Sequence, residues 1–265
     1  MAKTSPLGSL AGVNLDAVLA DIQRKQGGRL ASIAQQEQSY TSRLSAYGKV
    51  AGALTDWKSA AAALAKAFGA GGDEAGPDAD KIKSAVKSFV DAYNAAQKVM
   101  ASVGGYDKST GSGGALFGDK ALADARTQLR DVFNQTTGGA LADYGLSFDS
   151  DGTLQLDQDK LGAAIQSNPG GVRQFFIGDD GDAGLAGRAT ALVSALTGKG
   201  SPLAGASDDA LAMLALLDQS HENESDRVQQ LVASYRAQFQ QLSLVSYNFD
   251  VASMFMSDQL AVLRG

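Results

Sequence analysis

The chain has 265 residues, of which 44% are hydrophobic, and its formal net charge is −6 at pH 7. An acidic chain without a run of Lys or Arg is a poor ligand for a phosphate backbone, so we expect no nucleic acid partner. The sequence holds no cysteine and a single histidine, His221. This composition excludes disulfides, thiolate metal sites and multi-histidine zinc sites.

The sequence also lacks the patterns of membrane and signal segments. No apolar run approaches the roughly 18–20 residues that a transmembrane helix needs. Near the N-terminus the apolar residues are interrupted by Asn14, Asp16 and Asp21, unlike the core of a signal peptide. We therefore expect no membrane partner, and a protein that either stays in the cytosol or leaves by a route without a cleaved signal.

A short helical segment is predicted at the start of the chain. Leu15, Val18, Leu19 and Ile22 are spaced as on one helix face, and Asn14 is placed as the N-cap. The glycines of KQGG, residues 25–28, predict a break or bend after this segment.

A long helix is predicted over residues 29–68. Gly48 and Gly52 lie inside it, one turn apart; either they let a second helix approach closely, or they are weak positions that each cost about 1 kcal/mol. The apolar residues recur at intervals of three, four and seven, as in the apolar seam of a coiled coil. These residues are Leu30, Ile33, Tyr40, Leu44, Tyr47, Ala51, Leu54, Ala61, Leu64 and Phe68.

The middle of the chain begins with a linker. Residues 69–80, GAGGDEAGPDAD, hold almost nothing that could be buried. A helix is predicted to begin near Asp80, a loop is predicted at 104–114, and Asp119 is placed as the N-cap of a further helix.

The stretch LSFDSDGTLQLDQDK, residues 146–160, has the aspartates and the glycine of a calcium loop. With Gly152 at the sixth position of an EF-hand loop, position 12 falls on Gln158, which cannot supply the bidentate carboxylate. The flanks alternate apolar and polar residues as strands do, whereas an EF-hand needs helices. We expect a hairpin at 144–157 and no metal, followed by two short helical turns separated at Pro169.

The C-terminal part predicts a second long helix. No Gly or Pro occurs from Ser207 to Arg264, and a helix of that length would extend about 85 Å, more than a compact domain of this size holds. We therefore expect the terminal helices to pair with each other or with copies of themselves. The apolar residues again step by threes, fours and sevens: Val228, Leu231, Tyr235, Leu242, Val245, Phe249, Met256 and Leu263.

The last third of this helix is apolar on more than one face. A helix of this kind needs several neighbours, which a single N-terminal helix cannot supply. Self-assembly or a large partner is the expected explanation. The residues concerned are Tyr247, Phe249, Val251, Met254, Phe255, Met256 and Leu260.

Catalytic motifs are not found. GSGG and GAGG lack the lysine and the Ser or Thr of a phosphate loop, and no GxSxG motif occurs. The carboxylates fall mostly on solvated helix faces. We therefore expect a protein that is not an enzyme, with no catalytic residue, no metal and no cofactor.

Several blocks resemble one known family, in that family's order. They are SRLSAYGKVAGALTDWKSAAAAL (42–64), VKSFVDAYNAA (86–96), YDKSTGSGGALFGDKAL (106–122) and YGLSFDSDGTLQLDQDKLGAAIQSNPGGVRQFF (144–176). SYRAQFQQL and MSDQLA near the C-terminus match the family's last helix, and AGVNLDAVLADI near the start gives weaker support. The sequence is similar to the flagellar filament cap proteins, the FliD family, also called hook-associated protein 2.

The resemblance implies a secreted, non-enzymatic assembly protein of the bacterial flagellum. Members leave through the flagellar type III export apparatus, form a homo-oligomeric ring of about five subunits at the distal tip of the filament, and direct flagellin into place. Flagellin, the hook-filament junction proteins and an export chaperone are the implied partners. Paired terminal helices form a coiled-coil leg that contacts the filament, next to a helical bundle with a hairpin.

One departure concerns the middle of the family's chain. Members usually hold a long, mainly β insertion between the first long helix and the FVDAYN block, which forms the plate of the cap. Here only the linker at 69–80 stands in that place. Either the chain is a naturally minimal cap, or the insertion was removed from a longer protein; ring closure through the plate and adhesion do not carry over.

The expected fold is mainly α, with long N- and C-terminal helices in a coiled-coil leg and a helical bundle with a small β-hairpin. The expected parts are a leg segment at 1–28, a long helix at 29–68, the linker at 69–80, a bundle at 81–225 and a C-terminal leg helix at 226–265. The alternatives are another axial flagellar component, such as a junction protein or a flagellin relative, and a cytosolic coiled-coil scaffold.

The residues expected to make assembly contacts are the apolar positions of the two terminal helices, each of which could equally be core within the chain. They are Leu15, Val18, Leu19, Ile22, Leu231, Tyr235, Phe239, Leu242, Val245, Phe249, Met256 and Leu260.

Overall fold

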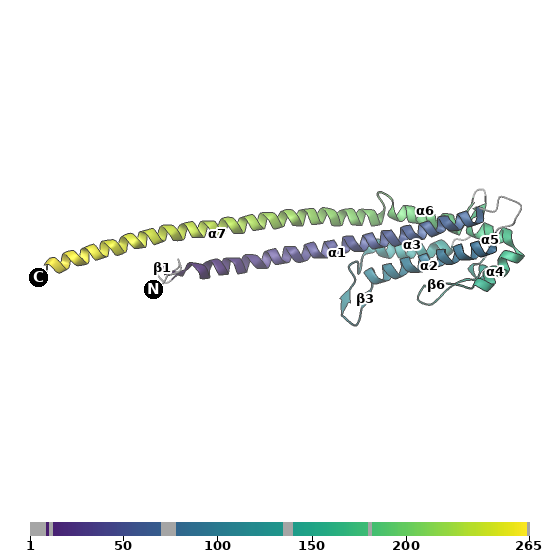
Figure 1. The fold of residues 1–265 in the computed structure, drawn as a ribbon, viewed down its shortest axis with the longest axis horizontal. Coiled ribbons are helices and arrows are strands. Elements are labelled where there is room, and N and C mark those ends of the chain that lie inside the picture. The colour runs from purple at the N-terminus through teal and green to yellow at the C-terminus, as the bar shows by residue number, and fades with distance from the viewer. Residues whose placement is uncertain (1–8, 11–12, 70–77, 135–139, 180–181, 264–265) are drawn as a thin grey trace. The chain divides into compact units, whose positions relative to one another are not determined.

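The computed structural model describes residues 9–10, 13–69, 78–134, 140–179 and 182–263, with the backbone alone described for 9–10, 13–16, 23, 182 and 261–263. Contacts divide the chain into two compact units. We call residues 1–38 with 213–265 the terminal unit, and residues 39–212 the bundle unit. The two longest helices, α1 (Leu15–Gly69) and α7 (Pro202–Leu263), each contribute to both units (Figure 1).

The fold is mainly α, as predicted, and its strands are short antiparallel pairs. A two-stranded pair, β1 (Ser9–Leu10) with β2 (Val13–Asn14), precedes α1. In the bundle unit α3 packs against α6, and α2 packs against α3 and α4. The remaining elements are α2 (Ala79–Gly104), β3 (Tyr106–Asp107), β4 (Ser112–Gly113), α3 (Lys120–Asn134), η1 (Leu141–Tyr144), β5 (Leu146–Phe148), β6 (Leu154–Leu156), α4 (Gln158–Ser167), α5 (Pro169–Phe176), β7 (Gly178–Asp179), β8 (Asp182–Ala183) and α6 (Leu185–Thr197).

Side-chain caps fix where the bundle helices begin. Asp78 accepts the amide of Asp80 at the start of α2, and Asp119 accepts the amide of Leu122 at 3.0 Å at the start of α3. Asp157 and Asn168 cap α4 and α5 in the same way. Each cap satisfies an amide that has no partner within its helix. The predicted helix start near Asp80 and the predicted cap at Asp119 are confirmed.

An aromatic cluster forms the centre of the bundle unit. Trp57 of α1 lies between Phe89 and Tyr93 of α2 and Phe133 of α3, with ring centroids 5.4, 5.6 and 6.2 Å away. Phe148 of β5 contacts Phe133 edge-on at 5.3 Å. Trp57 is fully buried, although it was not among the predicted apolar positions of this helix. Rings in these tilted and edge-on arrangements join the three helices and the hairpin in one core.

The calcium-like stretch is a hairpin, as predicted. Strands β5 and β6 pair in register, and the amide of Gly152 donates to the carbonyl of Asp149 at 2.9 Å. Gly152 has a φ of 86°, which favours glycine. Asp151 accepts the amide of Thr153, and this hydrogen bond lowers the pKa of the Asp151 carboxyl. The carboxylates of the loop therefore stabilise the turn.

The glycine-rich segments differ in how well they match the predictions. Helix α1 continues through residues 25–28, so the prediction of a break there is wrong. The surroundings of Gly27 and Gly28 are open, with no neighbouring atom within 4 Å of a Cβ built at either position. The hydrogen bonds of the helix outweigh the weak helix propensity of these glycines. Gly48 and Gly52 are equally open, which favours tolerated weak positions over close approach of a helix. The expected loop at 104–114 contains the pair β3–β4, and residues 70–77 of the predicted linker lie outside the described residues.

The contact-based boundaries, after residues 38 and 212, differ from those predicted after residues 28 and 225. Arg29 of α1 and Glu224 of α7 form an ion pair within the terminal unit, 3.8 Å between Nε and Oε2. This contact joins segments that the sequence analysis assigned to the long helix and to the bundle.

Candidate assembly surface

The terminal unit is an antiparallel pair of helix segments from α1 and α7 (Figure 1). Two contacts define the pairing: Arg29 with Glu224, and Arg227 Nη2, which donates to Gln26 Oε1. The residue number falls by three on one helix as it rises by three on the other, as antiparallel pairing requires.

The predicted contact residues of α1 lie in this pair. Leu19 is buried, and Val18 and Ile22 are half-buried. The side chain of Leu15 lies outside the described residues. On α7, Leu231 and Phe239 are half-buried, whereas Tyr235 is exposed. The register of the pair places Ile22 opposite Leu231, so the structure brings these two predicted residues together.

The remaining predicted residues are exposed. Because both helices rise equally per residue, the same register places Leu15, the first residue of α1, opposite about residue 238 of α7. Residues 239–260, which we call the distal segment, therefore extend beyond the start of α1. The exposed fraction is 75% for Phe249 and 63% for Met256, and Leu242, Val245 and Leu260 are exposed as well.

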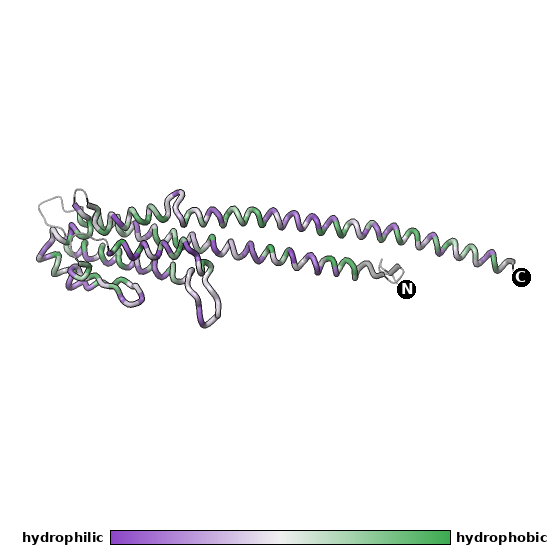
Figure 2. Tube along the Cα trace, turned by 180° about the vertical axis from the view of Figure 1, so that it is seen from behind, coloured by the Kyte–Doolittle hydropathy of each residue, from purple (hydrophilic) through white to green (hydrophobic). Residues whose placement is uncertain are grey.

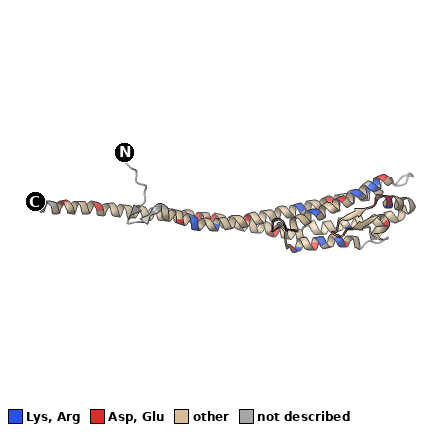
Figure 3. Cartoon of the chain, turned by 90° about the horizontal axis from the view of Figure 1, so that it is seen from below, with Lys and Arg blue, Asp and Glu red and all other residues tan. Residues whose placement is uncertain are grey.

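The distal segment carries exposed apolar side chains on more than one face of the helix. Tyr247, Val251, Met254 and Phe255 are also exposed, and at 100° per residue they lie on faces different from that of Phe249. From 240 to 260 the charged residues are Asp250 and Asp258, so no ion pair between successive turns can form there. Figure 2 shows the hydrophobic residues toward the C-terminus of α7, and Figure 3 shows no Lys or Arg along that stretch.

The exposed side chains of the distal segment leave a large apolar area in contact with solvent. Covering each large apolar side chain would contribute roughly 1.5–3 kcal/mol. The described part of α1 reaches only the first predicted residues, which leaves the distal segment uncovered. The methionines and aromatic rings there suit contact with another helix.

The sequence analysis did not identify the polar contacts of the terminal unit. Glu224 is 6% exposed and accepts from Arg227 through both oxygens, at 3.1 Å from Nε and 2.6 Å from Nη2. The hydrogen bonds from Arg227 and the charge of Arg29 lower the pKa of Glu224. The spacing of Glu224 could have identified it in the sequence. Glu224 lies seven residues after Leu217 and four before Val228, so it occupies a position of the apolar seam.

A second polar group, in the bundle unit, supports the fold. Tyr47 donates to Asp119 Oδ2 at 2.5 Å, and Arg43 Nη2 lies 3.3 Å from the same oxygen. Burial raises the pKa of Tyr47, and the bond to Asp119 raises it further. Since Asp119 also caps α3, these contacts tie α1 to the start of that helix.

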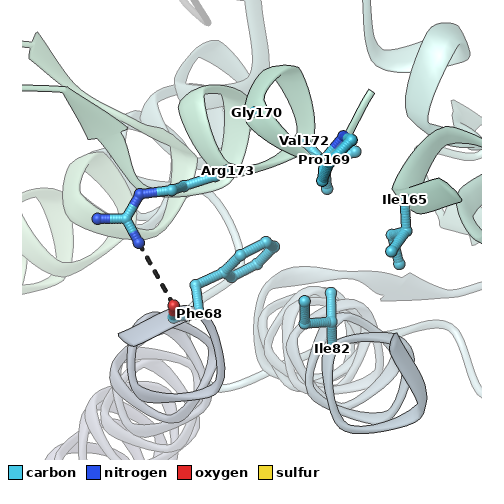
Figure 4. Close-up of a pocket in the computed structure, with 7 residues that line it drawn as sticks. All are labelled: Phe68, Ile82, Ile165, Pro169, Gly170, Val172 and Arg173. Carbon is cyan, nitrogen blue, oxygen red and sulfur yellow. Dashed lines mark hydrogen bonds between the residues drawn. The ribbon is translucent and has the colours of Figure 1, made fainter. Parts of the chain in front are cut away.

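The bundle unit also contains an apolar pocket of about 250 Å³ where α1 ends and α2 begins (Figure 4). Phe68, Ile82, Ile165 and Val172 contribute to its wall, with Pro169, Gly170 and Arg173. The guanidinium of Arg173 donates to the carbonyl of Phe68 at 3.3 Å, which satisfies a carbonyl at the end of α1. The wall of the pocket is therefore mainly apolar, and its one charged side chain, Arg173, already donates a hydrogen bond within the protein.

The described residues contain neither a cluster of metal-ligating side chains nor a membrane-spanning helix. Across the residues that the structure describes, no three His, Asp or Glu side chains converge as a metal site would require. Within the same residues, none of the helices combines the length and the apolar character that crossing a bilayer demands.

Comparison with known proteins adds the family. A family model described as "Flagellar hook-associated protein 2 C-terminus" matches residues 75–249. The flagellar hook-associated protein 2 of Escherichia coli strain K12 is 30% identical over 194 residues, which cover 69% of this chain and 42% of that protein. The protein of the same name from Salmonella typhimurium is 27% identical over 198 residues, 71% of this chain and 42% of that protein.

One solved structure is also similar, the D1-D2-D3 domains of the flagellar cap protein FliD from Escherichia coli. It has a TM-score of 0.45 and 31% identity, over 50% of this chain and 37% of that chain. The chain therefore spans less than half of the relatives that it matches, 42% in the Escherichia coli protein.

Proposed function

The chain belongs to the flagellar hook-associated protein 2 family, and we propose that it caps the flagellar filament and promotes the insertion of flagellin at the tip. The proposal places the protein outside the cell, at the distal end of the flagellum. Its partners are further copies of itself in a ring of about five, flagellin, the junction proteins, the export apparatus and an export chaperone. The relatives that the chain matches are named flagellar hook-associated protein 2, which supports a role in the flagellum.

The observation that supports it most directly is the uncovered distal segment. A cap must hold its own copies together and also contact the end of a helical polymer. We propose that the terminal unit makes these contacts through Leu242, Val245, Phe249, Met256 and Leu260, all exposed. Leu15, Val18, Leu19, Ile22, Leu231 and Tyr235 then hold the terminal helices in position, and Phe239, which is half-buried, lies where the distal segment begins.

The bundle unit has a different role in this proposal. Its core is closed and includes residues of α1 such as Trp57 and Leu64, which are fully buried, so this unit contributes a stable fold rather than a contact surface. No catalytic step is required, since inserting a subunit needs shape and binding rather than bond chemistry.

The test is complementation. The gene is deleted in its bacterial host, and the culture medium is assayed for monomeric flagellin with and without expression of this chain of 265 residues. We expect abundant free flagellin and short filaments in the deletion strain, and long filaments after complementation. Phe249→Leu serves as the matched control for Phe249→Asp, which should fail to complement. Normal filaments in the deletion strain would contradict the proposal.

A further inference from the structure

A buried charge lies in the otherwise apolar contact of the terminal unit. Among the described residues Glu224 is the buried charged side chain, at 6% exposure. Its partners come from both helices: Arg227 from α7, and Arg29 from α1 at 3.8 Å. Arg227 also donates to Gln26 of α1. The four side chains form one connected polar cluster.

The cluster occupies seam positions of both helices. On α7 the seam runs through Leu217, Glu224 and Leu231, spaced by seven, and on α1 Gln26 lies between Ile22 and Leu30. Ile22, Leu30 and Leu231 are half-buried, as seam residues of a two-helix pair should be. A polar layer therefore replaces one apolar layer of the pair.

Such a layer distinguishes between registers. If α7 slid by seven residues along α1, most apolar layers would again meet apolar layers, at little cost. Gln26 would then have left the cluster, and Leu19 or Ile33 would take its place beside a carboxylate that needs hydrogen bonds. A buried charge without its partners is costly, and a polar residue in an apolar seam is a well-attested means of fixing register.

We propose that Glu224, with Gln26 and Arg29, is a positioning cluster that fixes the register of α1 against α7. The register determines how much of α7 extends past the start of α1. A slip of one heptad would move the beginning of the distal segment by about 10 Å, which corresponds to two layers of seam side chains. The consequence for capping rests on the function proposed above; the register itself does not.

The chain is suited to a direct test because it has no native cysteine. Two cysteine pairs are introduced into the full chain: Ile22→Cys with Leu231→Cys, which matches the observed register, and Ile22→Cys with Gln238→Cys, which matches a slip of one heptad. Each pair is oxidised in an otherwise unchanged chain and in chains with Glu224→Leu or Glu224→Gln. Glu222→Leu is the matched control, since Glu222 lies two residues away and is exposed.

With Glu224 present, we expect the 22–231 disulfide to dominate. In Glu224→Leu the ratio of 22–231 to 22–238 disulfide should fall by about fivefold or more, because an apolar layer accepts several registers. Glu224→Gln should cause a smaller fall, and Glu222→Leu should cause none.

An unchanged ratio in Glu224→Leu would overturn the proposal. A parallel fall of both disulfides would also overturn it, because the cluster would then hold the helices together without selecting a register. Flagellin takes no part in this experiment, so a failed complementation test with a clear change of ratio would reject the capping role alone.

Discussion

The two units differ in how far they bury large apolar side chains of the same type. In the bundle unit Phe133 is 1% exposed and contacts other rings, whereas in the terminal unit Phe249 is 75% exposed. Both residues lie on helices with apolar residues at seam spacing. The difference lies in the neighbours: the bundle unit supplies them from its own helices, and the distal segment does not. Apolar seams in one chain can therefore be a core in one place and an exposed surface in another.

The comparison predicts a large loss of stability for a change in the bundle core. Phe133→Ala should lower the free energy of unfolding of the bundle unit by about 3–5 kcal/mol, because it leaves a cavity among the rings of Trp57, Tyr93 and Phe148. Denaturant unfolding followed by the fluorescence of Trp57, the single tryptophan, measures this. Phe249→Ala should change the same transition by less than about 0.5 kcal/mol. Equal effects of the two variants would contradict the distinction between the units.

A charged substitution in the distal segment, in contrast, should affect assembly and leave the stability of the bundle unit unchanged. Phe249→Asp places a charge at the centre of the distal segment and should weaken association by about 2 kcal/mol or more per contact. Sedimentation velocity of the purified chain, alone and with flagellin, measures association, while the unfolding of the bundle stays unchanged. Phe249→Leu keeps the apolar surface and should associate normally. An Asp variant that assembles as well as the unchanged chain would show that the surface lies elsewhere.

A smaller effect is expected where a polar contact supports the bundle. Asp119→Ala removes the cap of α3 and leaves the Tyr47 hydroxyl without its acceptor, at a cost of about 1–2 kcal/mol. The midpoint of denaturant unfolding should shift accordingly. Asp124→Ala is the control, because the Asp124–Lys120 pair is solvated and contributes little. A cost for Asp119→Ala no greater than that of the control would contradict this role.

The smallest effect concerns pH and the terminal unit. Arg227 and Arg29 lower the pKa of Glu224, so its contribution to helix pairing is present above the ordinary carboxyl range and is lost as the pH falls through the lowered pKa. Thermal unfolding followed by circular dichroism should show the transition of the terminal unit moving to lower temperature in acid. In Glu224→Gln the part of this shift that is due to Glu224 disappears. A shift of equal size in both chains would exclude Glu224 as its source.

Much of the fold could be predicted from local signals. Residue spacing and turn chemistry predict the caps at Asp119 and near Asp80, the hairpin around Gly152 and the long helix α7. The prediction of a break at residues 25–28 was wrong. Glycine reduces helix stability by only about 1 kcal/mol per position, and helical hydrogen bonds and packing offset that cost. Local propensity alone could not show that offset.

The candidate surface could be predicted in part. Spacing identified Ile22, Leu231 and Phe249 as seam residues, yet it could not separate those that α1 covers from those that extend beyond it. That separation depends on where α1 begins relative to α7, which is a property of the pair. Glu224 and Gln26 were missed because only apolar residues were sought at seam positions, although polar residues at such positions can set the register.

Hydrogen exchange of the distal segment tests most directly the claim that residues 239–260 are a surface that assembly covers. Peptides from this segment and from the bundle core around Phe133 are compared between the free chain and the chain assembled on flagellin filaments. We predict fast exchange of the distal peptides in the free chain, strong protection after assembly, and no change for the core peptides. Equal exchange of the distal peptides in both states would contradict the claim.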